Sequence, residues 1–497
     1  MPVDARRTRA PALPLATLAL GALLLLAPPP WRGAAAAFGW WGAFPGSGGG
    51  GGGEVRAQAA AEDAGLEWLD GGLAPERGPY WQFAGDQALS VRWRAPGAAP
   101  AEATYLLFAR PSAGAAAGPP GPWMVARATP SEEPGFEREY RVRVGGLQPG
   151  GLYDYALAPE PPVSASSTSA APPAAAPVYR LRVPPAPDRG GVRAWVIGDP
   201  GRRGDGLGRV HAAMRDFAGE RGWDLTLAVG DLAYEDARDW ELTQHFFQPL
   251  RPALAETPTV PTFGNHDAHA SDWESQTGPY FDAFDLPPRH GAPPGEKAYH
   301  SFAVGGTHFV NLESARRGPH GDAAMLQWLE ADLERVTGGG DRPDWIVAVL
   351  HHPPYSKGSH NSYDEWDLRQ LRHHIVPRLE KYGVDLVVAG HSHSYERSHV
   401  LLRDEPLASS QDGAAAAAGR EQLRKGCSAG GAGGAVYVVT GSASQTGGGS
   451  LNHPAMVKGF NERGSVLLEA DPHQLKVDFV TEGGEVKDSF RLTKPAC

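Results

Sequence analysis

The sequence contains little cysteine, no N-glycosylation sequon and no long basic segment. Only two cysteines, Cys427 and Cys497, occur in 497 residues, so the chain is not a small domain held together by several disulfides. The two could pair in an oxidising compartment, or Cys497 could stay free. Because no Asn-x-Ser/Thr sequon is present, we do not expect N-glycosylation even on a secretory route.

Positive charge forms no long run in the chain. The net charge is −11, and the Lys and Arg residues do not form a long run. Nucleic-acid-binding proteins usually carry a basic patch, so no nucleic-acid partner is expected. A composition of 41% hydrophobic and 21% charged residues is typical of globular proteins, and the length allows about two to four domains.

The N-terminus has the pattern of a targeting segment. Arginines among the first ten residues precede an apolar run, Leu15–Ala27, and small residues follow at Ala34–Ala37. This pattern predicts a signal peptide over residues 1–37 and a secreted, secretory-pathway or vacuolar protein. The apolar run is shorter than the roughly 20 residues of a membrane span, so no stable span is expected. A retained signal anchor is one alternative. A plastid transit peptide is a second alternative, which is disfavoured because such peptides are Ser-rich and no Ser occurs before Ser47.

The chain then divides into a linker and two further regions. Residues 38–72 include a glycine run and are predicted to be a Gly-rich linker. Residues 73–186 contain short stretches in which apolar and polar residues alternate, such as Leu89–Trp93 and Tyr140–Val144, separated by Gly and Pro turn signals. Without an intervening helical pattern, these stretches predict an antiparallel, all-β sandwich.

Residues 190–497 alternate between apolar strand patterns and helical patterns. Helices are expected at Gly208–Gly222, Ala323–Val336 and Asp364–Tyr382. This alternation predicts an α/β domain with a largely parallel sheet core. A low-complexity insertion is expected at residues 404–434, and further strands are expected between it and the C-terminus.

Five short segments share one layout, in which an apolar strand ends in polar, ligand-type residues. The pairs of strand and polar segment are Ala194–Ile197 with Gly198–Gly201, Leu225–Val229 with Gly230–Tyr234, Thr259–Phe263 with Gly264–Asp267, Ile346–Leu350 with His351–Pro353, and Val384–Ala389 with Gly390–His393. Ligands of open α/β sheets collect beyond the carboxyl ends of strands. The segments are therefore expected to converge on one site.

These segments offer two Asp, one Asn, one Tyr and at least three His as donors. Such a mixed oxygen and nitrogen set is larger than one tetrahedral ion requires and suits two hard or borderline cations. Two cations about 3.5–4 Å apart can clamp an in-line displacement at phosphorus. The sequence therefore predicts phosphate chemistry at a dinuclear centre.

The order Gly-Asp-x-Gly, Gly-Asp-x-x-Tyr, Gly-Asn-His-Asp, His-x-Pro and Gly-His-x-His resembles the purple acid phosphatase branch of the calcineurin-like metallophosphoesterases. The resemblance covers Val196–Arg397. It implies a two-sheet α/β sandwich, preceded by a fibronectin-III-like sandwich. It also implies a ferric ion beside a divalent Zn, Mn or Fe(II) ion, and a small phosphate-ester substrate. A homodimer is compatible with the resemblance.

The resemblance assigns seven metal ligands. Those expected to hold the ferric ion are Asp199, Asp231, Tyr234 and His393, with Asp231 bridging to the second ion. Those expected to hold the divalent ion are Asn265, His351 and His391. One departure concerns the fourth motif, because Ala348 stands where the family usually has Val. His352 is therefore an alternative to His351, although Pro353 lies at the offset that favours His351.

Three further residues are expected to act in catalysis. His266 is the candidate general acid, and Asp267 beside it is expected to orient the imidazole and favour its protonated form. His360 lies nine residues after His351, where the family has a histidine that faces the substrate; a solvated loop residue is the alternative interpretation.

The resemblance favours an acid phosphatase that hydrolyses phosphate monoesters by attack of a metal-activated hydroxide. A phosphodiesterase or nucleotide pyrophosphatase would use the same core with a different pocket rim. A non-catalytic extracellular binding protein is a further alternative, which the presence of all seven expected ligands disfavours.

Overall fold

The computed structural model describes residues 75–494, apart from 86–87, 98–102, 114–118, 132–137, 161–170, 189, 287–296, 316–322, 340–341, 408–420 and 425–432. The predicted signal peptide, the predicted linker and both cysteines lie outside the described residues, as does most of the predicted insertion. Of that insertion, β18 (Glu405–Pro406) and β19 (Glu421–Arg424) are described. Among the described residues, no helix is both long enough and apolar enough to cross a membrane.

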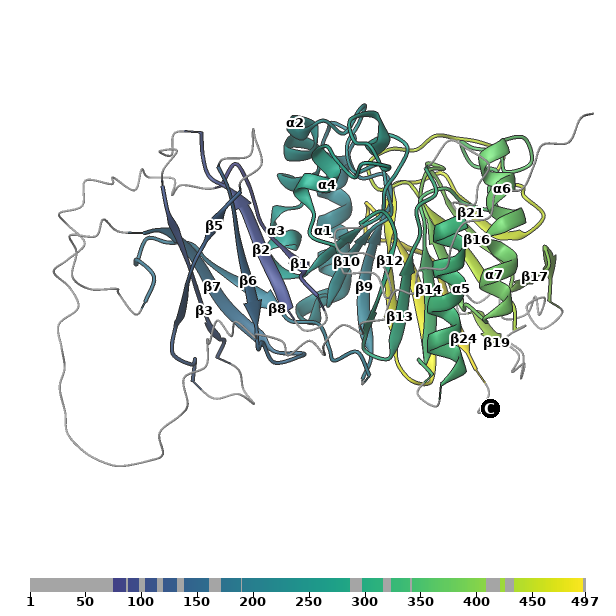
Figure 1. Ribbon diagram of the computed structural model, residues 1–497. Coiled ribbons are helices and arrows are strands. Elements are labelled where there is room, and N and C mark those ends of the chain that lie inside the picture. Colours follow the sequence, from purple (N-terminus) through teal and green to yellow (C-terminus); the bar gives the residue numbers. More distant parts are fainter. Residues whose placement is uncertain are drawn as a thin grey trace, which may run out of the picture. The chain divides into compact units, whose positions relative to one another are not determined.

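Two four-stranded antiparallel sheets follow the linker (Figure 1). Their strands are β1 (Arg77–Phe83), β2 (Ala88–Arg94), β3 (Tyr105–Pro111), β4 (Met124–Arg127), β5 (Thr129–Pro130), β6 (Glu139–Gly145), β7 (Leu152–Pro159) and β8 (Val178–Arg182). The sheet orders are β1-β2-β6-β5 and β4-β3-β7-β8. Aromatic and aliphatic side chains from both sheets, including Trp81, Trp93 and Tyr155, form one buried cluster. The predicted all-β sandwich is therefore present.

Two seven-stranded mixed sheets form the core of the rest of the described chain, and β17 (Leu401–Leu402) pairs with β18 in a separate two-stranded sheet. The first, in spatial order, contains β11 (Thr259–Pro261), β10 (Leu225–Ala228), β9 (Val192–Ile197), β22 (Gly464–Ala470), β23 (Gln474–Thr481), β24 (Val486–Thr493) and β19. The second contains β12 (His300–Val304), β13 (Thr307–Asn311), β14 (Trp345–Val349), β15 (Leu386–Ala389), β20 (Val436–Thr440), β16 (Tyr395–Ser398) and β21 (Met456–Phe460). Strands β9 to β11 and β13 to β15 with β20 run parallel, β19 pairs in parallel with β24, and the other neighbouring strands pair antiparallel.

The alternation of side chains along the strands explains how the two sheets pack. Ala194 and Val196 of β9 lie in the same buried cluster as Val347 and Val349 of β14. The intervening residue Trp195 belongs to a separate cluster with the helices. Because successive strand residues face opposite sides, each sheet buries one face on the other sheet and one under helices.

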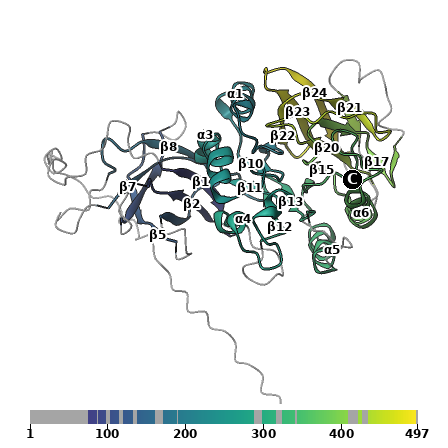
Figure 2. The ribbon, with the colours of Figure 1, turned by 90° about the horizontal axis from the view of Figure 1, so that it is seen from above.

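Helices cover the outer faces of the two sheets, with α1 on one side and α5 and α6 on the other (Figure 2). The helices are α1 (Gly206–Ala218), α2 (Asp239–Glu241), α3 (Arg251–Glu256), α4 (Pro279–Ala283), α5 (Ala323–Gly338), α6 (Trp366–His374) and α7 (Val376–Lys381). Shorter turns are η1 (Gly219–Arg221), η2 (Leu242–Phe247) and η3 (Asp267–His269). The single helix expected at Asp364–Tyr382 is wrong, because it is divided at Ile375, and Pro377 lies in the first turn of α7.

The sandwich differs from the sequence prediction in one respect. Alternation along β2 predicts a half-buried strand with Ser90 and Arg92 in solvent, yet both are buried. They contact Asp285, which follows α4. An isolated bridge also joins Trp81 of β1 to Pro258, directly before β11. The outer face of this sheet is therefore covered by the α/β part of the chain, which periodicity within one strand cannot reveal.

Candidate metal centre

The predicted ligands lie at the carboxyl ends of parallel strands, in the loops after β9, β10, β14 and β15 and the segment after β11. Three of them, Asp199, Asp231 and His391, have positive φ angles of 53°, 52° and 64°. This left-handed conformation costs a residue with a side chain about 1–2 kcal/mol. Such strain recurs at functional sites, where the surrounding structure imposes it.

Glycines precede these ligands because neighbouring groups leave no space for a side chain. A Cβ at Gly230, which has φ +93°, would lie 2.2 Å from Nδ1 of His351. A Cβ at Gly264 would lie 2.3 Å from the backbone nitrogen of Asp231. The glycines of the motifs therefore allow the loops to approach one another closely.

One group of donors surrounds the Tyr234 hydroxyl. This oxygen lies 2.9 Å from Oδ1 of Asp199, 3.1 Å from Oδ2 of Asp231 and 3.1 Å from Nε2 of His393. A phenol has one hydrogen to donate, so it cannot satisfy all three neighbours. Burial raises the pKa of Tyr234 well above its ordinary value, and the charges of Asp199 and Asp231 raise it further.

A second group of donors meets at His351. Its Nε2 lies 3.0 Å from Oδ1 of Asn265 and 3.3 Å from Oδ1 of Asp231. The His391 ring lies 5.1 Å from the His351 ring, measured between centroids. Asp231 thus presents one oxygen to Tyr234 and the other to His351, so its carboxylate lies between the two groups.

The charges of the two aspartates point to a cation. Asp199 and Asp231 are 0% and 1% exposed, and their ion-pair neighbours among the described residues are histidines rather than Lys or Arg. Buried charges are normally paired or coordinate metals. Ligand atoms of Asp199, Asp231 and His351 lie within 4.8 Å of one another and could hold an ion. The donor set therefore fits metal binding.

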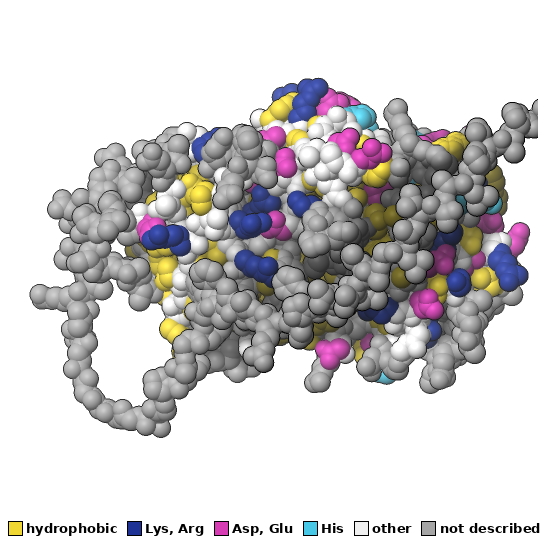
Figure 3. Space-filling view, in the orientation of Figure 1, with side chains coloured by type: hydrophobic (Ala, Val, Ile, Leu, Met, Phe, Trp, Pro, Cys, Tyr) yellow, Lys and Arg dark blue, Asp and Glu magenta, His cyan; other side chains and the backbone are white. Residues whose placement is uncertain are grey.

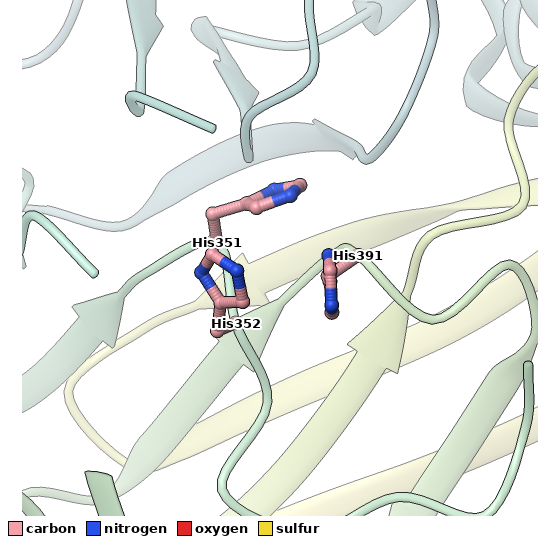
Figure 4. A group of neighbouring side chains, drawn as sticks. All are labelled: His351, His352 and His391. Atoms are coloured by element: carbon pink, nitrogen blue, oxygen red, sulfur yellow. The ribbon is translucent and has the colours of Figure 1, made fainter. Parts of the chain in front are cut away.

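The fourth motif contains two adjacent histidines whose rings are turned apart, with His391 beside them (Figure 4). Nδ1 of His351 bonds to the carbonyl of Val229, leaving Nε2 toward Asn265. Nδ1 of His352 lies 3.2 Å from Oγ of Ser314. Burial, followed by the charge of His391, lowers the pKa of His352 well below its ordinary value, so this ring is a neutral, packed neighbour.

His266 lies at the rim of the first donor group, with Nε2 3.9 Å from Oδ2 of Asp231. Its Nδ1 lies 2.6 Å from the carbonyl oxygen of Glu235, so Nδ1 carries a hydrogen and Nε2 faces the site. This differs from the expectation that Asp267 orients the imidazole. The backbone carbonyl of Glu235 does so, which a sequence motif cannot indicate.

Asp267 instead joins two of the motif loops. Its carboxylate accepts hydrogen bonds from the backbone N–H groups of Asp231, Leu232 and Gly264 at 3.0, 3.1 and 2.8 Å. Burial raises the pKa of Asp267 to about 7, and the charge of Asp231 acts in the same direction. Asp267 therefore fixes the relative position of two predicted ligand loops through their backbone N–H groups.

His360 lies beside the second donor group and is not a solvated loop residue. Its ring stacks on His391 with centroids 3.7 Å apart, and its Nδ1 lies 2.8 Å from Oε2 of Glu365. Glu365 precedes α6 and was not singled out from the sequence. Its place before the helix gave no indication that it would reach a histidine five residues earlier.

Gln445 is a second residue of the site that none of the five motifs includes. Its Nε2 lies 3.2 Å from Nε2 of His393, and the neighbouring Ser444 donates from Oγ to the backbone oxygen of Asp199. Both follow β20, which pairs in parallel with β15. The layout of a strand followed by polar residues was therefore present a sixth time, and would have indicated this loop.

Comparison with known proteins supports this description. The family model described as calcineurin-like phosphoesterase matches residues 192–395. Purple acid phosphatase 22 of Arabidopsis thaliana is 30% identical over 224 residues, which are 44% of this chain and 48% of that relative. Acid phosphatase type 7 of Homo sapiens is 26% identical over 190 residues, or 35% of this chain and 41% of the relative. The matches thus span about half or less of these relatives.

Solved structures show the same fold. A purple acid phosphatase from yellow lupin (Lupinus luteus) seeds superposes with a TM-score of 0.60 at 19% identity, covering 85% of this chain and 76% of that one. The structure of PhoD gives a TM-score of 0.56 at 16% identity, covering 84% and 89%. Residues 192–395 are therefore a calcineurin-like phosphoesterase domain, and the chain is similar to purple acid phosphatases, as the five motifs predicted.

Proposed function

We propose that the protein hydrolyses phosphate monoesters at a dinuclear metal centre. The observation that carries this proposal is the position of Asp231, whose two carboxylate oxygens face different donor groups. A carboxylate in this position is suited to bridge two cations. The similarity to purple acid phosphatases over part of their length supports the same activity.

The proposed division of ligands follows the two groups. Tyr234 and His393, with Asp199, would hold the ferric ion, because a phenolate is a hard anionic donor and its formation needs a strong cation in this buried position. Asn265, His351 and His391 would hold a divalent ion. His351 is preferred to His352 because its Nε2 faces Asn265 and Asp231, whereas His352 packs on Ser314.

Metal ions held here would neutralise phosphoryl oxygens and lower the pKa of a bound water. His266 would donate a proton from Nε2 to the leaving-group oxygen, since Glu235 holds its other nitrogen. His360 would donate from Nε2 to a phosphoryl oxygen, with Glu365 accepting from Nδ1. This last bond fixes the imidazole orientation and holds the hydrogen on Nδ1.

The proposal is tested by metal analysis and turnover together. Full-length protein loaded with iron and zinc should contain two ions per chain and hydrolyse p-nitrophenyl phosphate at mildly acidic pH. Asp231→Asn should lose both properties. A wild-type protein that retains well under two ions per chain, or that is inactive with two, would contradict it and favour a non-catalytic binding protein.

The choice between monoesters and diesters needs its own comparison. Turnover of p-nitrophenyl phosphate should exceed that of bis-(p-nitrophenyl) phosphate under the same conditions. The opposite ratio would indicate a phosphodiesterase or nucleotide pyrophosphatase with the same metal core.

The remaining assignments are also proposals. Residues 73–186 would be a fibronectin-III-like domain, supported by the strand orders β1-β2-β6 and β4-β3-β7-β8, and residues 190–497 the catalytic domain. The N-terminal pattern supports a signal peptide and a secretory or vacuolar location. On the face shown in Figure 3, basic and acidic side chains of the described residues are interspersed, which suits a small-molecule substrate better than a nucleic acid.

A further inference from the structure

The sandwich places three buried arginines around one glutamate. Arg77, Arg92 and Arg94 come from β1 and β2, and each lies within 3.3 Å of a carboxylate oxygen of Glu139 in β6. The side chains of Arg77 and Glu139 are 0% and 1% exposed. One carboxylate cannot neutralise three guanidinium groups, and buried charges require partners.

The balancing carboxylates come from the α/β part of the chain. Asp239 accepts a bidentate pair from Arg94 at 2.6 and 2.8 Å and a bond from Arg77 at 2.5 Å. Asp285 accepts from Arg92 at 3.4 Å and from Ser90 at 2.9 Å. Two separate carboxylates therefore connect the sandwich to the α/β part, at two different loops.

Only one of these two carboxylates belongs to the loop that carries a proposed metal ligand. Asp239 begins α2, five residues after Tyr234. At the end of α2, the buried Glu241 accepts hydrogen bonds from the backbone N–H groups of Glu235, Asp236 and Arg238 at 3.0, 3.3 and 2.9 Å. The segment from Tyr234 to Glu241 is thus folded on itself, and Asp239 attaches it to the sandwich.

The same segment supplies the carbonyl that orients His266. The Glu235 oxygen lies 2.6 Å from Nδ1 of His266, and the Glu235 nitrogen is fixed by Glu241. We propose that Arg77 and Arg94 of the sandwich are positioning residues for the phosphate-ester reaction, because through Asp239 they hold the loop whose Glu235 carbonyl aims His266 at the leaving group. This inference rests on the proposed function of His266 as general acid.

A positioning role predicts a selective defect. General acid catalysis matters when the leaving group is a poor one, such as an alkoxide, and matters little when it is p-nitrophenolate. Loosening the loop should therefore lower kcat for an alkyl phosphate and leave kcat for p-nitrophenyl phosphate almost unchanged. A purely structural role would lower the turnover of both esters in proportion to the amount of folded enzyme.

The test compares two isosteric substitutions at the same interface. Asp239→Asn removes the charge that Arg77 and Arg94 hold, and Asp285→Asn removes the charge that Arg92 holds. Both variants leave a sandwich arginine short of one carboxylate, but only the first touches the loop after Tyr234. Metal content, kcat and KM are measured for p-nitrophenyl phosphate and β-glycerophosphate, with Asp239→Glu as the charge-retaining variant.

Asp239→Asn should lose about tenfold or more in kcat on β-glycerophosphate, part of the 10²- to 10⁴-fold that a positioned acid supplies. Its kcat on p-nitrophenyl phosphate should stay within about twofold, consistent with an intact metal site, and Asp239→Glu should recover part of the loss. Asp285→Asn should leave the ratio of the two esters unchanged. If Asp239→Asn does not fold, Arg94→Lys is the alternative variant, because it keeps the charge and loses the bidentate hydrogen bonds to Asp239. It should show the same selective loss of kcat on β-glycerophosphate.

A second measurement does not depend on metal or turnover. Amide hydrogen exchange of Glu235, Asp236 and Arg238 should accelerate in Asp239→Asn and not in Asp285→Asn. Equal losses on both esters, or unchanged exchange in this loop, would overturn the positioning role. A metal-loaded wild-type protein without activity on either ester would overturn the proposed function instead, and the exchange result would still decide whether the sandwich holds the loop.

Discussion

The hydroxyl of Tyr234 lies 3.1 Å from Nε2 of His393, although 159 positions separate them in the sequence. Tyr234 follows β10 of the first sheet, and His393 follows β15 of the second. Their contact therefore joins the two sheets at their common edge. Neither sheet alone could form this group of donors, so the site requires the two sheets to be packed against each other.

Replacing Tyr234 by Phe should remove the visible absorption of the iron-loaded protein. The substitution keeps the ring and deletes the phenolic donor that touches Asp199, Asp231 and His393. Ferric affinity should fall by about 10–100-fold or more, the loss usual even for groups behind the ligands. Visible spectroscopy and iron analysis measure both effects.

Tyr437→Phe is the matched control for this substitution. Tyr437 is buried in the same domain, and its hydroxyl has no hydrogen-bond partner among the described residues. Its removal should leave colour and iron content unchanged. A Tyr234→Phe protein that keeps the wild-type spectrum would show that the phenol is not a ligand.

Variants of the two histidines in the fourth motif should differ in the number of metal ions that they bind. His351→Asn is expected to reduce tightly bound metal from two ions to about one per chain, because Nε2 of His351 faces Asn265 and Asp231. His352→Asn should retain both ions, because its ring packs on Ser314 and His391. Retention of two ions by His351→Asn and loss by His352→Asn would shift the ligand by one residue.

Asp267→Asn should destabilise the protein and weaken both metal sites without altering a proposed ligand. The carboxylate accepts three backbone hydrogen bonds from two ligand loops, and an amide offers one acceptor oxygen and a repelling NH₂ group. Above pH 7, where the carboxyl group is ionised, the loss should be about 1.5–3 kcal/mol, as for a hydrogen bond to a charged group. Chemical denaturation and a metal-binding titration of the variant measure it; unchanged values in both would contradict the role.

The strands that end in proposed ligands were predictable because each pattern lies within one short stretch of sequence. An apolar run of strand length followed by Gly-Asp or Gly-His can be recognised without knowledge of the rest of the chain. The glycines are required by contacts that do not appear in the sequence, such as Gly230 against His351. Their position directly before each ligand nevertheless made the loops visible.

Contacts that side chains make with other segments of the chain were not predictable in the same way. Asp267 was expected to orient its neighbour His266, yet it binds backbone groups of another loop, and a backbone carbonyl orients His266. Glu365 and Gln445 reach the site only after the sheets and α6 have packed. Ser90 and Arg92 were expected in solvent because periodicity describes one strand and not what covers it.

At acidic pH, the free energy of unfolding should depend on His211, which lies outside the metal centre. Its ring packs beside Trp195 and Trp223, and its Nε2 has no hydrogen-bond partner among the described residues. Burial, with a contribution from Arg215, lowers the pKa of His211 from 6.5 to about 4. The folded protein therefore keeps this imidazole neutral at pH values where the unfolded chain is already protonated.

The difference in pKa between the folded and unfolded states determines how stability changes with pH. Above pH 6.5 both states are neutral and the histidine costs nothing. As the pH falls from 6.5 toward 4, the unfolded state binds the proton first, so the free energy of unfolding should decrease, by about 3 kcal/mol in total from this residue. His211→Phe keeps an aromatic ring beside the tryptophans and cannot be protonated, so the stability of this variant should fall less steeply over this range. Urea denaturation at a series of pH values, with the exposed His473→Phe as control, measures the slopes; parallel curves for wild type and His211→Phe would show that the buried ring is protonated as readily as in the unfolded chain.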